Sequence, residues 1–374
     1  MLKTFKIQIG GQVQGVGFRP FVFNLAQKHQ LKGTVSNNAN GVLIYTNGTS
    51  EELMNFMEDI LEKAPDAAII QNSSMDEIES MAFENFSIVP SQKTAKVAIP
   101  LTADLAICNS CKKEIQDPKN RRYRYAFTTC TQCGPRYAIT YKFPFERTHT
   151  TMSQFTMCES CVAEYENPKD SRFHSQTNSC QDCGITMQLL SNSGEPILVE
   201  NERELLGTVA RFLKEGAIVA LKNTSGYLLC VDATNPEAVK KLRQRKQRPT
   251  KPFALLYPNM EKIHEAYEVS KHEQNALESG VCPIVLLDAK RQTKSNLAED
   301  VAPGLNRYGV MLPSSALLTL LSIEAQIPLV ATSGNIHGSP ILSSEKEARE
   351  KLSGVADYFL NHNLEIVYPQ DDSV

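Results

Sequence analysis

Residues 108–133 read CNSCKKEIQDPKNRRYRYAFTTCTQC, and residues 158–183 read CESCVAEYENPKDSRFHSQTNSCQDC. Both stretches carry four cysteines in the pattern C-x2-C-x18-C-x2-C, and the second begins fifty residues after the first. The similarity extends beyond the cysteines, because Pro118 and Arg122 recur as Pro168 and Arg172. The middle of the chain is therefore a tandem repeat of one small unit.

Four cysteines at this spacing form the ligand set of a tetrahedral structural zinc site, so the repeat predicts two zinc ions. Pairing in sequence order is our first expectation, and interleaved pairing between the repeats stays open. Both arrangements use the same eight ligands: Cys108, Cys111, Cys130, Cys133, Cys158, Cys161, Cys180 and Cys183. His149 and His174 are alternative ligands, but eight thiolates already fill two sites.

Disulfide bonding is the alternative use of these cysteines. The first residues, MLKTFKIQIGG, contain neither the long apolar run nor the small-residue cleavage site of an export signal. Tandem C-x-x-C pairs in a chain without such a signal favour metal over disulfides. Cys230 and Cys282, outside the repeat, lie in apolar surroundings and are predicted to be buried. We therefore expect a protein of the reducing cytoplasm.

The bulk properties set further limits. A chain of 374 residues is long enough for two or three domains. Its net charge of −3 gives no overall field that would recruit nucleic acid or an anionic membrane. No segment reaches the ~18 consecutive apolar residues that a transmembrane helix needs.

The first 91 residues show the pattern of a small α+β module. Phe5, Ile7 and Ile9 alternate with polar residues, as in a half-buried strand. A helix is predicted from Pro20, and a second one over residues 51–63 with Ser50 as its cap. Further strands are expected at residues 33–35, 42–45, 68–71 and 86–89. This order predicts a ferredoxin-like β-α-β-β-α-β fold.

The loop between the first strand and the first helix carries the chemistry of this module. Gly15 and Gly17 let backbone N–H groups turn inward, and the helix N-terminus adds positive potential, which suits a phosphate. Arg19 can neutralise charge on a transferring phosphoryl group. Asn37 is placed to orient an attacking water. A Gly-x-Gly-x-Arg loop by itself is often a plain turn.

The complete string is more specific than the loop. Gln14-Gly15-Val16-Gly17-Phe18-Arg19, followed by Gly33-x-Val35-x-Asn37, resembles the acylphosphatase motif over about ninety residues. The resemblance implies that Arg19 binds an acyl phosphate and that Asn37 holds the nucleophilic water. The remaining loop residues, Gln14 to Phe18, would then cradle the phosphate.

Residues 197–374 alternate between helical and strand-like patterns and predict an α/β domain around a mixed sheet. The expected helices cover residues 202–215, 236–246, 260–270 and 315–325. The expected strands are the apolar runs at residues 217–221, 227–231, 253–256, 284–287 and 329–331.

Three clusters in this domain suit a nucleoside triphosphate with its metal. They are Lys222, the basic loop of Lys246, Arg248 and Lys251, and the loop Thr332-Ser333-Gly334-Asn335 after a buried strand. By itself, the basic loop could equally be a solvated helix end.

The surrounding sequence resembles the YrdC-like adenylate-forming family, through K-x-x-x-G-Y-x-L-x-x-D-A from Lys222 and K-x-R-P-x-K-P-F-A from Lys246. The resemblance implies an ATP site with Mg2+, formed by Lys222, Lys246, Arg248, Lys251, Ser333 and Asn335.

Taken together, an acylphosphatase-like module (1–91), two four-cysteine ribbons (100–190) and a YrdC-like domain (197–374) resemble the N-terminal half of the HypF carbamoyltransferase family. That resemblance implies hydrolysis of carbamoyl phosphate to carbamate, followed by its activation with ATP as carbamoyl adenylate. A further domain would pass the carbamoyl group to a cysteine of a HypE-type acceptor, for the cyanide ligands of nickel–iron hydrogenase. The chain ends where that domain would begin, so we expect complete transfer to require more than this chain.

The sequence departs from the family pattern at two places near the predicted ATP loop. Ser314-Ser315-Ala316 stands where the family usually has Tyr-Thr-Pro. Ile336-His337-Gly338-Ser339 replaces the more usual x-Ser-Gly-Glu. Both departures concern the adenylation site and leave the acylphosphatase motif intact.

A nucleic-acid-binding protein is the alternative from another class, because zinc ribbons and YrdC-like domains both occur with RNA partners. The run from Arg121 to Phe127 would supply stacking aromatic and basic groups. A solvated face with local packing accounts for this run better, and residues that face a channel or a neighbouring domain account for it better still. The acidic net charge and the acylphosphatase motif argue against nucleic acid. Two elaborate motifs, CGPRY at 133–137 and RFHSQ at 172–176, receive no role from the sequence.

Overall fold

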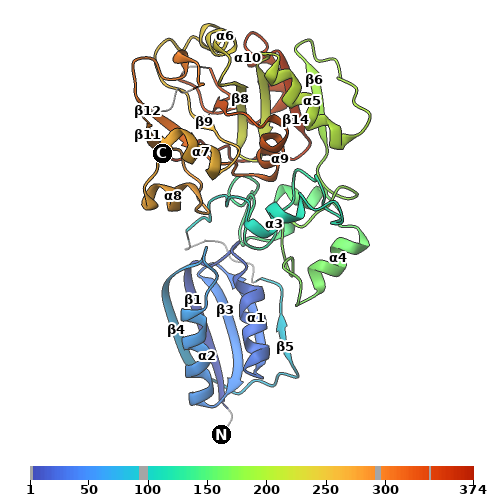
Figure 1. The fold of residues 1–374 in the computed structure, drawn as a ribbon. Coiled ribbons are helices and arrows are strands. Elements are labelled where there is room, and N and C mark those ends of the chain that lie inside the picture. Colours follow the sequence, from blue (N-terminus) through green and yellow to red (C-terminus); the bar gives the residue numbers. More distant parts are fainter. Residues whose placement is uncertain (1–2, 92–99, 291–295, 337) are drawn as a thin grey trace. The chain divides into compact units, whose positions relative to one another are not determined.

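The computed structural model describes residues 3–91, 100–290, 296–336 and 338–374. The chain forms two compact units (Figure 1). The first consists of Met1–Ala103 with Cys130–Asn178, and the second of Asp104–Thr129 with Ser179–Val374. Each unit is built around one sheet.

The sheet of the first unit has five strands in the order β4-β1-β3-β2-β5. Strand β1 pairs antiparallel with β3 and β4, whereas β2 pairs antiparallel with β3 and parallel with β5. The strands are β1 (Lys3–Gln12), β2 (Lys32–Asn38), β3 (Gly41–Gly48), β4 (Ile69–Ile78) and β5 (Phe86–Ile88). The predicted ferredoxin-like module is confirmed.

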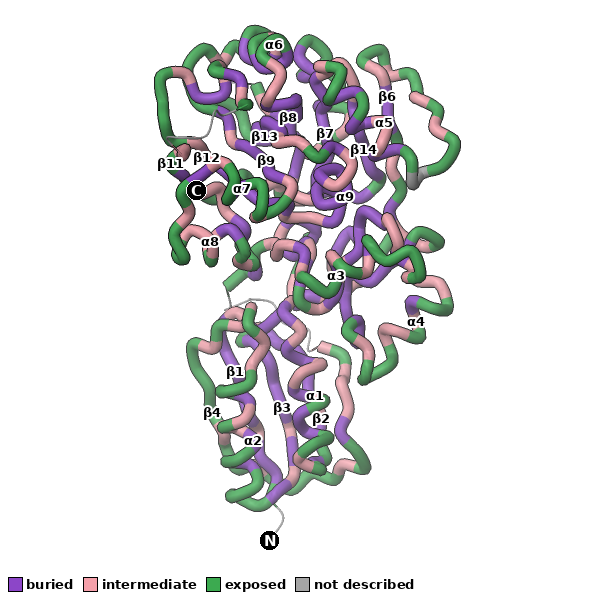
Figure 2. Tube along the Cα trace, in the orientation of Figure 1, coloured by how far each residue is buried: buried purple, intermediate pink, exposed green. Residues whose placement is uncertain are grey.

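Two helices, α1 (Phe18–Lys28) and α2 (Ser50–Glu62), cover one face of this sheet (Figure 1). Their apolar faces bury Val22, Leu25, Leu53 and Phe56 against the inward side chains of the strands. The central strands β1 and β3 are largely buried, whereas the edge strand β4 is exposed along most of its length (Figure 2). The two helices therefore shield one face of the sheet, and the β1–α1 loop lies between the end of β1 and the start of α1.

The predicted cap of α2 was one residue off. Thr49, not Ser50, accepts the N–H of Glu52, and the Glu52 carboxylate accepts the Thr49 N–H at 2.8 Å. This reciprocal pair satisfies two of the free N–H groups at the helix start.

The two cysteine stretches fold alike. Short helices, α3 (Asn109–Glu114) and α4 (Glu159–Glu166), begin directly after the first cysteine of each stretch. In both copies a residue with left-handed backbone follows: Arg124 has φ 61° and His174 has φ 55°. Their N–H groups donate over 2.9 Å to the carbonyls of Ile115 and Tyr165, which are equivalent positions. The sequence repeat is thus a repeat of backbone structure as well.

Two 3-10 helices, η1 (Arg147–His149) and η2 (Thr151–Gln154), lie between the copies in sequence. They belong to the first unit.

The sheet of the second unit has nine strands in the order β10-β11-β12-β9-β13-β8-β7-β14-β6. It is mixed, as predicted, because β12–β9 and β14–β7 are parallel pairs and the other pairs are antiparallel. The strands are β6 (Met187–Ser191), β7 (Val219–Asn223), β8 (Gly226–Asp232), β9 (Leu255–Leu256), β10 (Tyr267–Glu268), β11 (Val285–Ala289), β12 (Arg307–Met311), β13 (Leu329–Ser333) and β14 (Tyr358–His362).

The helices of this unit are α5 (Glu202–Lys214), α6 (Pro236–Lys246), α7 (Met260–Ala266), α8 (Lys271–Leu277), α9 (Ala316–Ala325) and α10 (Glu345–Leu352), with a 3-10 turn η3 (Glu299–Val301). The central strands β7, β8 and β13 are buried along nearly all of their length (Figure 2). Two of the residues that the sequence assigned to ATP lie at strand ends here, Lys222 in β7 and Ser333 in β13.

The predicted helix over residues 260–270 is wrong beyond Ala266. The chain leaves the helix there, forms the two-residue strand β10, and restarts as α8 with a capping box of Ser270 and Glu273. No helix among the described residues is both long and apolar enough to cross a membrane.

Candidate active site and metal centres

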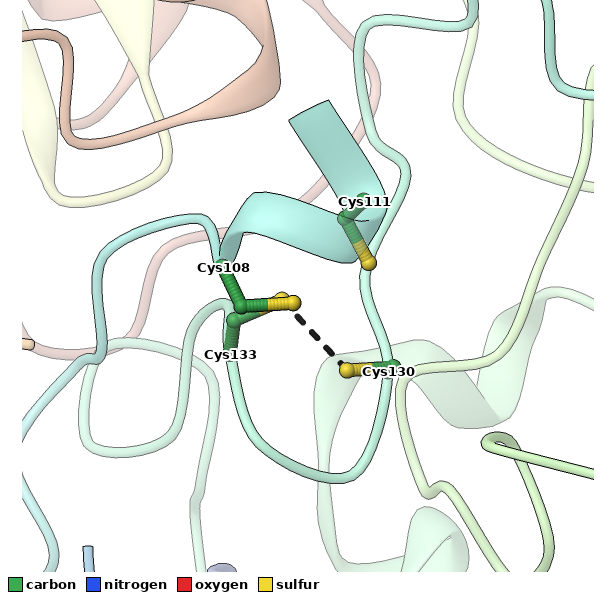
Figure 3. A group of neighbouring side chains, drawn as sticks. All are labelled: Cys108, Cys111, Cys130 and Cys133. Atoms are coloured by element: carbon green, nitrogen blue, oxygen red, sulfur yellow. Dashed lines mark hydrogen bonds between the residues drawn. The ribbon is translucent and has the colours of Figure 1, made fainter. Parts of the chain in front are cut away.

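The eight repeat cysteines gather into two groups in sequence order: Cys108, Cys111, Cys130 and Cys133, and Cys158, Cys161, Cys180 and Cys183. Within each group the four Sγ atoms lie within 4.8 Å of one another, and those of the first group point toward a common centre (Figure 3). None of these eight described cysteines forms a disulfide bond. The default pairing is confirmed, and the disulfide alternative is wrong.

The sulfur spacing suits zinc. Cys130 and Cys133 have Sγ atoms 3.8 Å apart, and so do Cys180 and Cys183. A tetrahedron with Zn–S bonds of ~2.3 Å has edges of about 3.8 Å, whereas a disulfide needs about 2.0 Å. The Gln132 N–H lies 3.4 Å from Cys130 Sγ, and the Arg121 guanidinium donates to Cys180 Sγ at 3.1 Å. The donor sets therefore fit two structural zinc ions with supporting N–H groups.

Neither histidine belongs to these groups. His149 Nδ1 lies 2.7 Å from the Pro144 carbonyl oxygen. His174 lines a cavity beside Arg19, and burial, with a further contribution from the Arg19 charge, lowers its pKa to about 4. Its imidazole is therefore neutral near pH 7.

The β1–α1 loop has the backbone that a phosphate cradle needs. Gly15 and Gly17 both have φ 76°, a left-handed conformation that other residues rarely adopt. Gly17 directly precedes α1, so the free N–H groups of the helix start lie at the end of the loop. The backbone of the loop agrees with the predicted cradle, and phosphate binding by it stays a prediction.

Arg19 lies in the first turn of α1 and is 9% exposed. Its Nη1 is 3.2 Å from Oε1 of Glu146, and its Nη2 is 3.4 Å from the Phe145 carbonyl oxygen. Burial lowers the pKa of Arg19, and the Glu146 carboxylate opposes that shift. The guanidinium thus already holds one oxygen anion, which itself accepts a hydrogen bond from Ser91.

Asn37 lies near the end of β2 and is 1% exposed. Its Oδ1 has no hydrogen-bond partner among the described residues. Arg19, Asn37 and Gly15 line one cavity. The structure therefore brings the two predicted catalytic residues and the loop together.

Two side chains hold this loop in place. Gln14 Nε2 donates to the carbonyls of Asn38 and Gly41, both at 2.8 Å, and its Oε1 accepts the Phe145 N–H at 3.2 Å. Arg136 donates from Nε to the Gly15 carbonyl oxygen. The Gln14 side chain thus fixes neighbouring backbone. Within the predicted phosphate loop, Gln14 supports the structure of the loop.

Arg136 was missed as a site residue. Its Nη groups also bond the carbonyls of Thr131 at 3.1 Å and Cys130 at 3.3 Å, so one guanidinium ties a zinc ligand's backbone to the loop. It belongs to the CGPRY motif, whose complexity was the only signal in the sequence.

Four of the residues predicted to bind ATP meet at one place in the second unit. Lys246 ends α6 and donates to the carbonyls of Ser333 at 2.6 Å and Asn335 at 2.9 Å, and to Asn335 Oδ1 at 3.0 Å. Arg248 Nη1 lies 3.4 Å from Thr332 Oγ1. The basic loop is therefore tied to the loop after β13, and it is not a solvated helix end.

The glycine of that loop is required by close packing. The Gly334 N–H donates to the Tyr227 carbonyl oxygen at 2.6 Å, and a Cβ at Gly334 would lie 2.5 Å from Tyr227 Cβ. Only glycine allows this approach.

Lys222 and Lys251 stand outside this group of contacts in the described residues. The Lys222 ammonium is buried at the end of β7 and donates to the carbonyls of His362 at 3.0 Å and Leu364 at 2.9 Å. Burial lowers its pKa. Lys251 is exposed and accepts from Arg248 through its backbone carbonyl at 3.1 Å.

The run from Arg121 to Phe127 packs inward. Arg122 is 2% exposed and donates from Nε to the Ser179 carbonyl at 2.9 Å. Arg124 pairs with Glu324 of α9 at 2.6 Å, and Phe127 packs edge-on against His362. The prediction of local packing is therefore confirmed for Arg122, Arg124 and Phe127, whereas these three side chains do not form a solvated face.

Three family models match the chain. One described as Acylphosphatase matches residues 5–88, one described as HypF finger matches residues 107–140 and 157–190, and one described as Telomere recombination matches residues 211–374. The carbamoyltransferase HypF of Synechocystis sp. is 46% identical over 374 residues, which is 100% of this chain and 48% of that protein.

The carbamoyltransferase HypF2 of Cupriavidus necator is 43% identical over 385 residues, with 99% of this chain and 47% of that protein covered. A crystal structure of full-length HypF, in a phosphate- and nucleotide-bound form, superposes on 100% of this chain and 48% of its own, with a TM-score of 0.93 and 41% identity.

The chain belongs to the HypF carbamoyltransferase family. It spans about half the length of the curated relatives it matches. The HypF finger matches cover both cysteine groups, which agrees with structural zinc in both. Membership of the HypF family does not favour the nucleic-acid-binding alternative.

Of the two departures from the HypF pattern, Ser315 caps α9, because its Oγ accepts the Leu318 N–H at 3.1 Å. In the second departure Ser339 accepts the Asn335 Nδ2 donor at 2.7 Å through its carbonyl. His337 lies outside the described residues.

Proposed function

We propose that this chain hydrolyses carbamoyl phosphate to carbamate and then activates the carbamate with ATP as carbamoyl adenylate. The proposal depends on one observation: Arg19 and Asn37 line the same cavity. The loop beside it contains Gly15 and Gly17, both with φ 76°, and the chain belongs to the HypF family. The HypF crystal structure that it resembles is described as phosphate- and nucleotide-bound.

The first reaction needs an anion cradle and an oriented water. Arg19 and the N–H groups before α1 bind the phosphoryl oxygens, and the free Oδ1 of Asn37 accepts a hydrogen bond from the water. The water oxygen attacks phosphorus, the bond to the carbamoyl oxygen breaks, and carbamate leaves while a water proton passes to solvent. Glu146 must release Arg19 for the phosphate to enter, since both are anions that need the same guanidinium.

The second reaction joins a carbamate oxygen to the α-phosphorus of ATP and releases pyrophosphate. Lys246, Arg248, Ser333 and Asn335 are our candidates for the triphosphate, with Lys222 and Lys251 in supporting positions. Mg2+ would accompany ATP as part of the substrate. Lys246 supports this role because its charge lies at the loop of Ser333 and Asn335, and binding of the triphosphate would exchange one of its three oxygen partners for a phosphate oxygen.

Phosphate release from carbamoyl phosphate tests the first reaction. The parent chain should release phosphate, and Arg19→Ala should lower kcat/KM at least about a hundredfold, since a charged donor to the transition state is lost. Arg211→Ala, on an exposed α5 arginine, is the matched control and should behave as the parent. A zinc-loaded parent that releases no phosphate would exclude this half of the proposal.

Exchange of labelled pyrophosphate into ATP tests the second reaction. We expect exchange only when carbamoyl phosphate is present, because it supplies the carbamate. Exchange that is absent under these conditions, in a chain that does release phosphate, would remove the adenylation step from this chain.

The partners and location are part of the same proposal. A HypE-type acceptor protein would take the carbamoyl group through a domain that the HypF relatives carry beyond the matched half. We propose a cytoplasmic location, and three domains at residues 1–91, 100–190 and 197–374.

A further inference from the structure

The cavity around Arg19 and Asn37 has one wall that the acylphosphatase motif does not explain. His174, Ser175 and Gln176, from the second cysteine repeat, line it together with the loop residues. These three residues belong to the RFHSQ motif at 172–176, which the sequence left without a role.

Ser175 is the unusual member of this wall. It is 2% exposed, and its Oγ has no hydrogen-bond partner among the described residues. Buried polar groups are nearly always hydrogen-bonded, so an orphan hydroxyl in a cavity wall points to a ligand or a water. Asn37 Oδ1 is a second unpartnered acceptor in the same cavity.

The first copy of the repeat has a residue at the position equivalent to Ser175, and there the side chain has a structural role. Tyr125 is the equivalent of Ser175. The backbone N–H of each donates to the carbonyl oxygen of the arginine three residues earlier, over 3.0 Å for Tyr125 and 2.9 Å for Ser175. The Tyr125 hydroxyl is fully used: it accepts the Ile185 N–H at 2.8 Å and lies 3.1 Å from Ser179 Oγ. The backbone is the same in both copies, and only the second copy leaves its hydroxyl free.

We propose that Ser175 selects the carbamoyl group by accepting a hydrogen bond from its amino group, an inference that rests on the proposed hydrolysis of carbamoyl phosphate. Arg19 holds the phosphoryl end, and the Ser175 wall receives the acyl end. Carbamoyl and acetyl groups have nearly the same shape, but only the carbamoyl group offers N–H donors. A site with buried acceptors leaves them unpaired when acetyl phosphate binds, and so disfavours it.

The test compares kcat/KM for carbamoyl phosphate and acetyl phosphate in the zinc-loaded chain, corrected for spontaneous breakdown. The parent should prefer carbamoyl phosphate. Ser175→Ala should lower its kcat/KM for carbamoyl phosphate roughly tenfold and leave that for acetyl phosphate within about twofold, as expected for one lost hydrogen bond. Ser171→Ala, at an exposed serine of the same segment, should change neither.

Inhibition by inorganic phosphate distinguishes a loss of selectivity for the carbamoyl group from general damage to the site. Ser175→Ala should leave the inhibition constant unchanged, because phosphate binds at the Arg19 end. An unchanged ratio of the two substrates, or an equal loss on both with weaker phosphate inhibition, would overturn the role of Ser175. A parent that hydrolyses neither substrate would instead overturn the proposed function, and this inference with it.

Discussion

Lys246 is held by three oxygen atoms and yet is easily deprotonated. Burial, followed by the nearby charge of Arg248, lowers its pKa to about 8, from an ordinary value of 10.5. A lysine that binds phosphate must be charged, so its binding should fail as the pH rises through about 8. The Lys246 ammonium therefore loses its proton within the pH range of ordinary assays.

We therefore predict that the affinity of the chain for ATP with Mg2+ falls severalfold between pH 7 and pH 9.5. Lys246→Arg should bind ATP with little change over this range, because an arginine remains charged. Calorimetry across the pH range measures both. A parent whose affinity is flat to pH 9.5 would contradict a role for Lys246 as a phosphate ligand.

At the residue scale, local motifs named residues that the structure also brings together. Arg19 and Asn37 line one cavity, and the eight cysteines form two groups, each named from spacings within a short stretch of sequence. Glu146, Arg136 and Ser175 could not be found in this way. The contact from Glu146 to Arg19 spans 127 residues and that from Arg136 to Gly15 spans 121, so only the folded chain brings them together.

At the scale of elements, Asp357 joins the start of β14 to helix α6. Its carboxylate accepts the Ile218 N–H at 2.8 Å and pairs with Lys241 and Arg245, both at 2.7 Å. Burial alone would raise the pKa of Asp357, but these hydrogen bonds hold it below its ordinary value of 3.8. A carboxylate with a lowered pKa stabilises the fold above pH ~4, and that contribution is lost as the pH falls through the folded-state value.

Asp357→Asn should therefore destabilise the second unit by about 1–2 kcal/mol at pH 7, since two charged partners lose their acceptor at a partly exposed site. The difference between parent and variant should shrink at pH 3. Urea midpoints at both pH values measure it. Asp288→Asn, at an exposed pair with Arg307, is the control and should change stability by less than about 0.5 kcal/mol. An equal loss for Asp357→Asn at pH 3 and pH 7 would show that its charge is not what matters.

Among the elements of the second unit that the sequence missed are strands β6, β10, β12 and β14 and helices α8 and α10. Strand β10 has two residues, too few for any periodicity, and it exists because β11 supplies a partner. Strand β9 lies within the predicted run 253–256 but keeps only two of its residues. Strand β14 was missed because its sequence, YFLNH, is short and ends in two polar residues that are nevertheless buried. Long amphipathic helices such as α5 were found, because their period is visible without partners.

At the scale of the whole molecule, the two metal groups separate the ten cysteines into two classes. Eight form the two four-cysteine groups that fit zinc, whereas Cys230 and Cys282 are buried thiols. Burial raises the pKa of Cys230 to about 12 and that of Cys282 to about 11, so neither is reactive near neutral pH. The repeat has few buried apolar residues between its cysteines, so metal supplies much of its stability.

We predict about two zinc ions per chain by elemental analysis. A strong chelator should release both, and a thiol reagent should then label eight cysteines. Cys230→Ala is the control and should give the same zinc content and the same eight labelled thiols. One zinc per chain, or thiols that react fully before chelation, would contradict two four-cysteine sites.

The left-handed backbone of Arg124 and His174 bears on how the repeat arose. Non-glycine residues seldom adopt this conformation, and its occurrence at the same position of both copies is best explained by duplication of one ancestral segment. The shared metal-binding pattern and backbone hydrogen bonds do not depend on the side chain at the position that follows, so the two copies can differ there. In one copy that position is Tyr125, whose hydroxyl is hydrogen-bonded within the fold. In the other it is Ser175, which lines the cavity of Arg19 and Asn37.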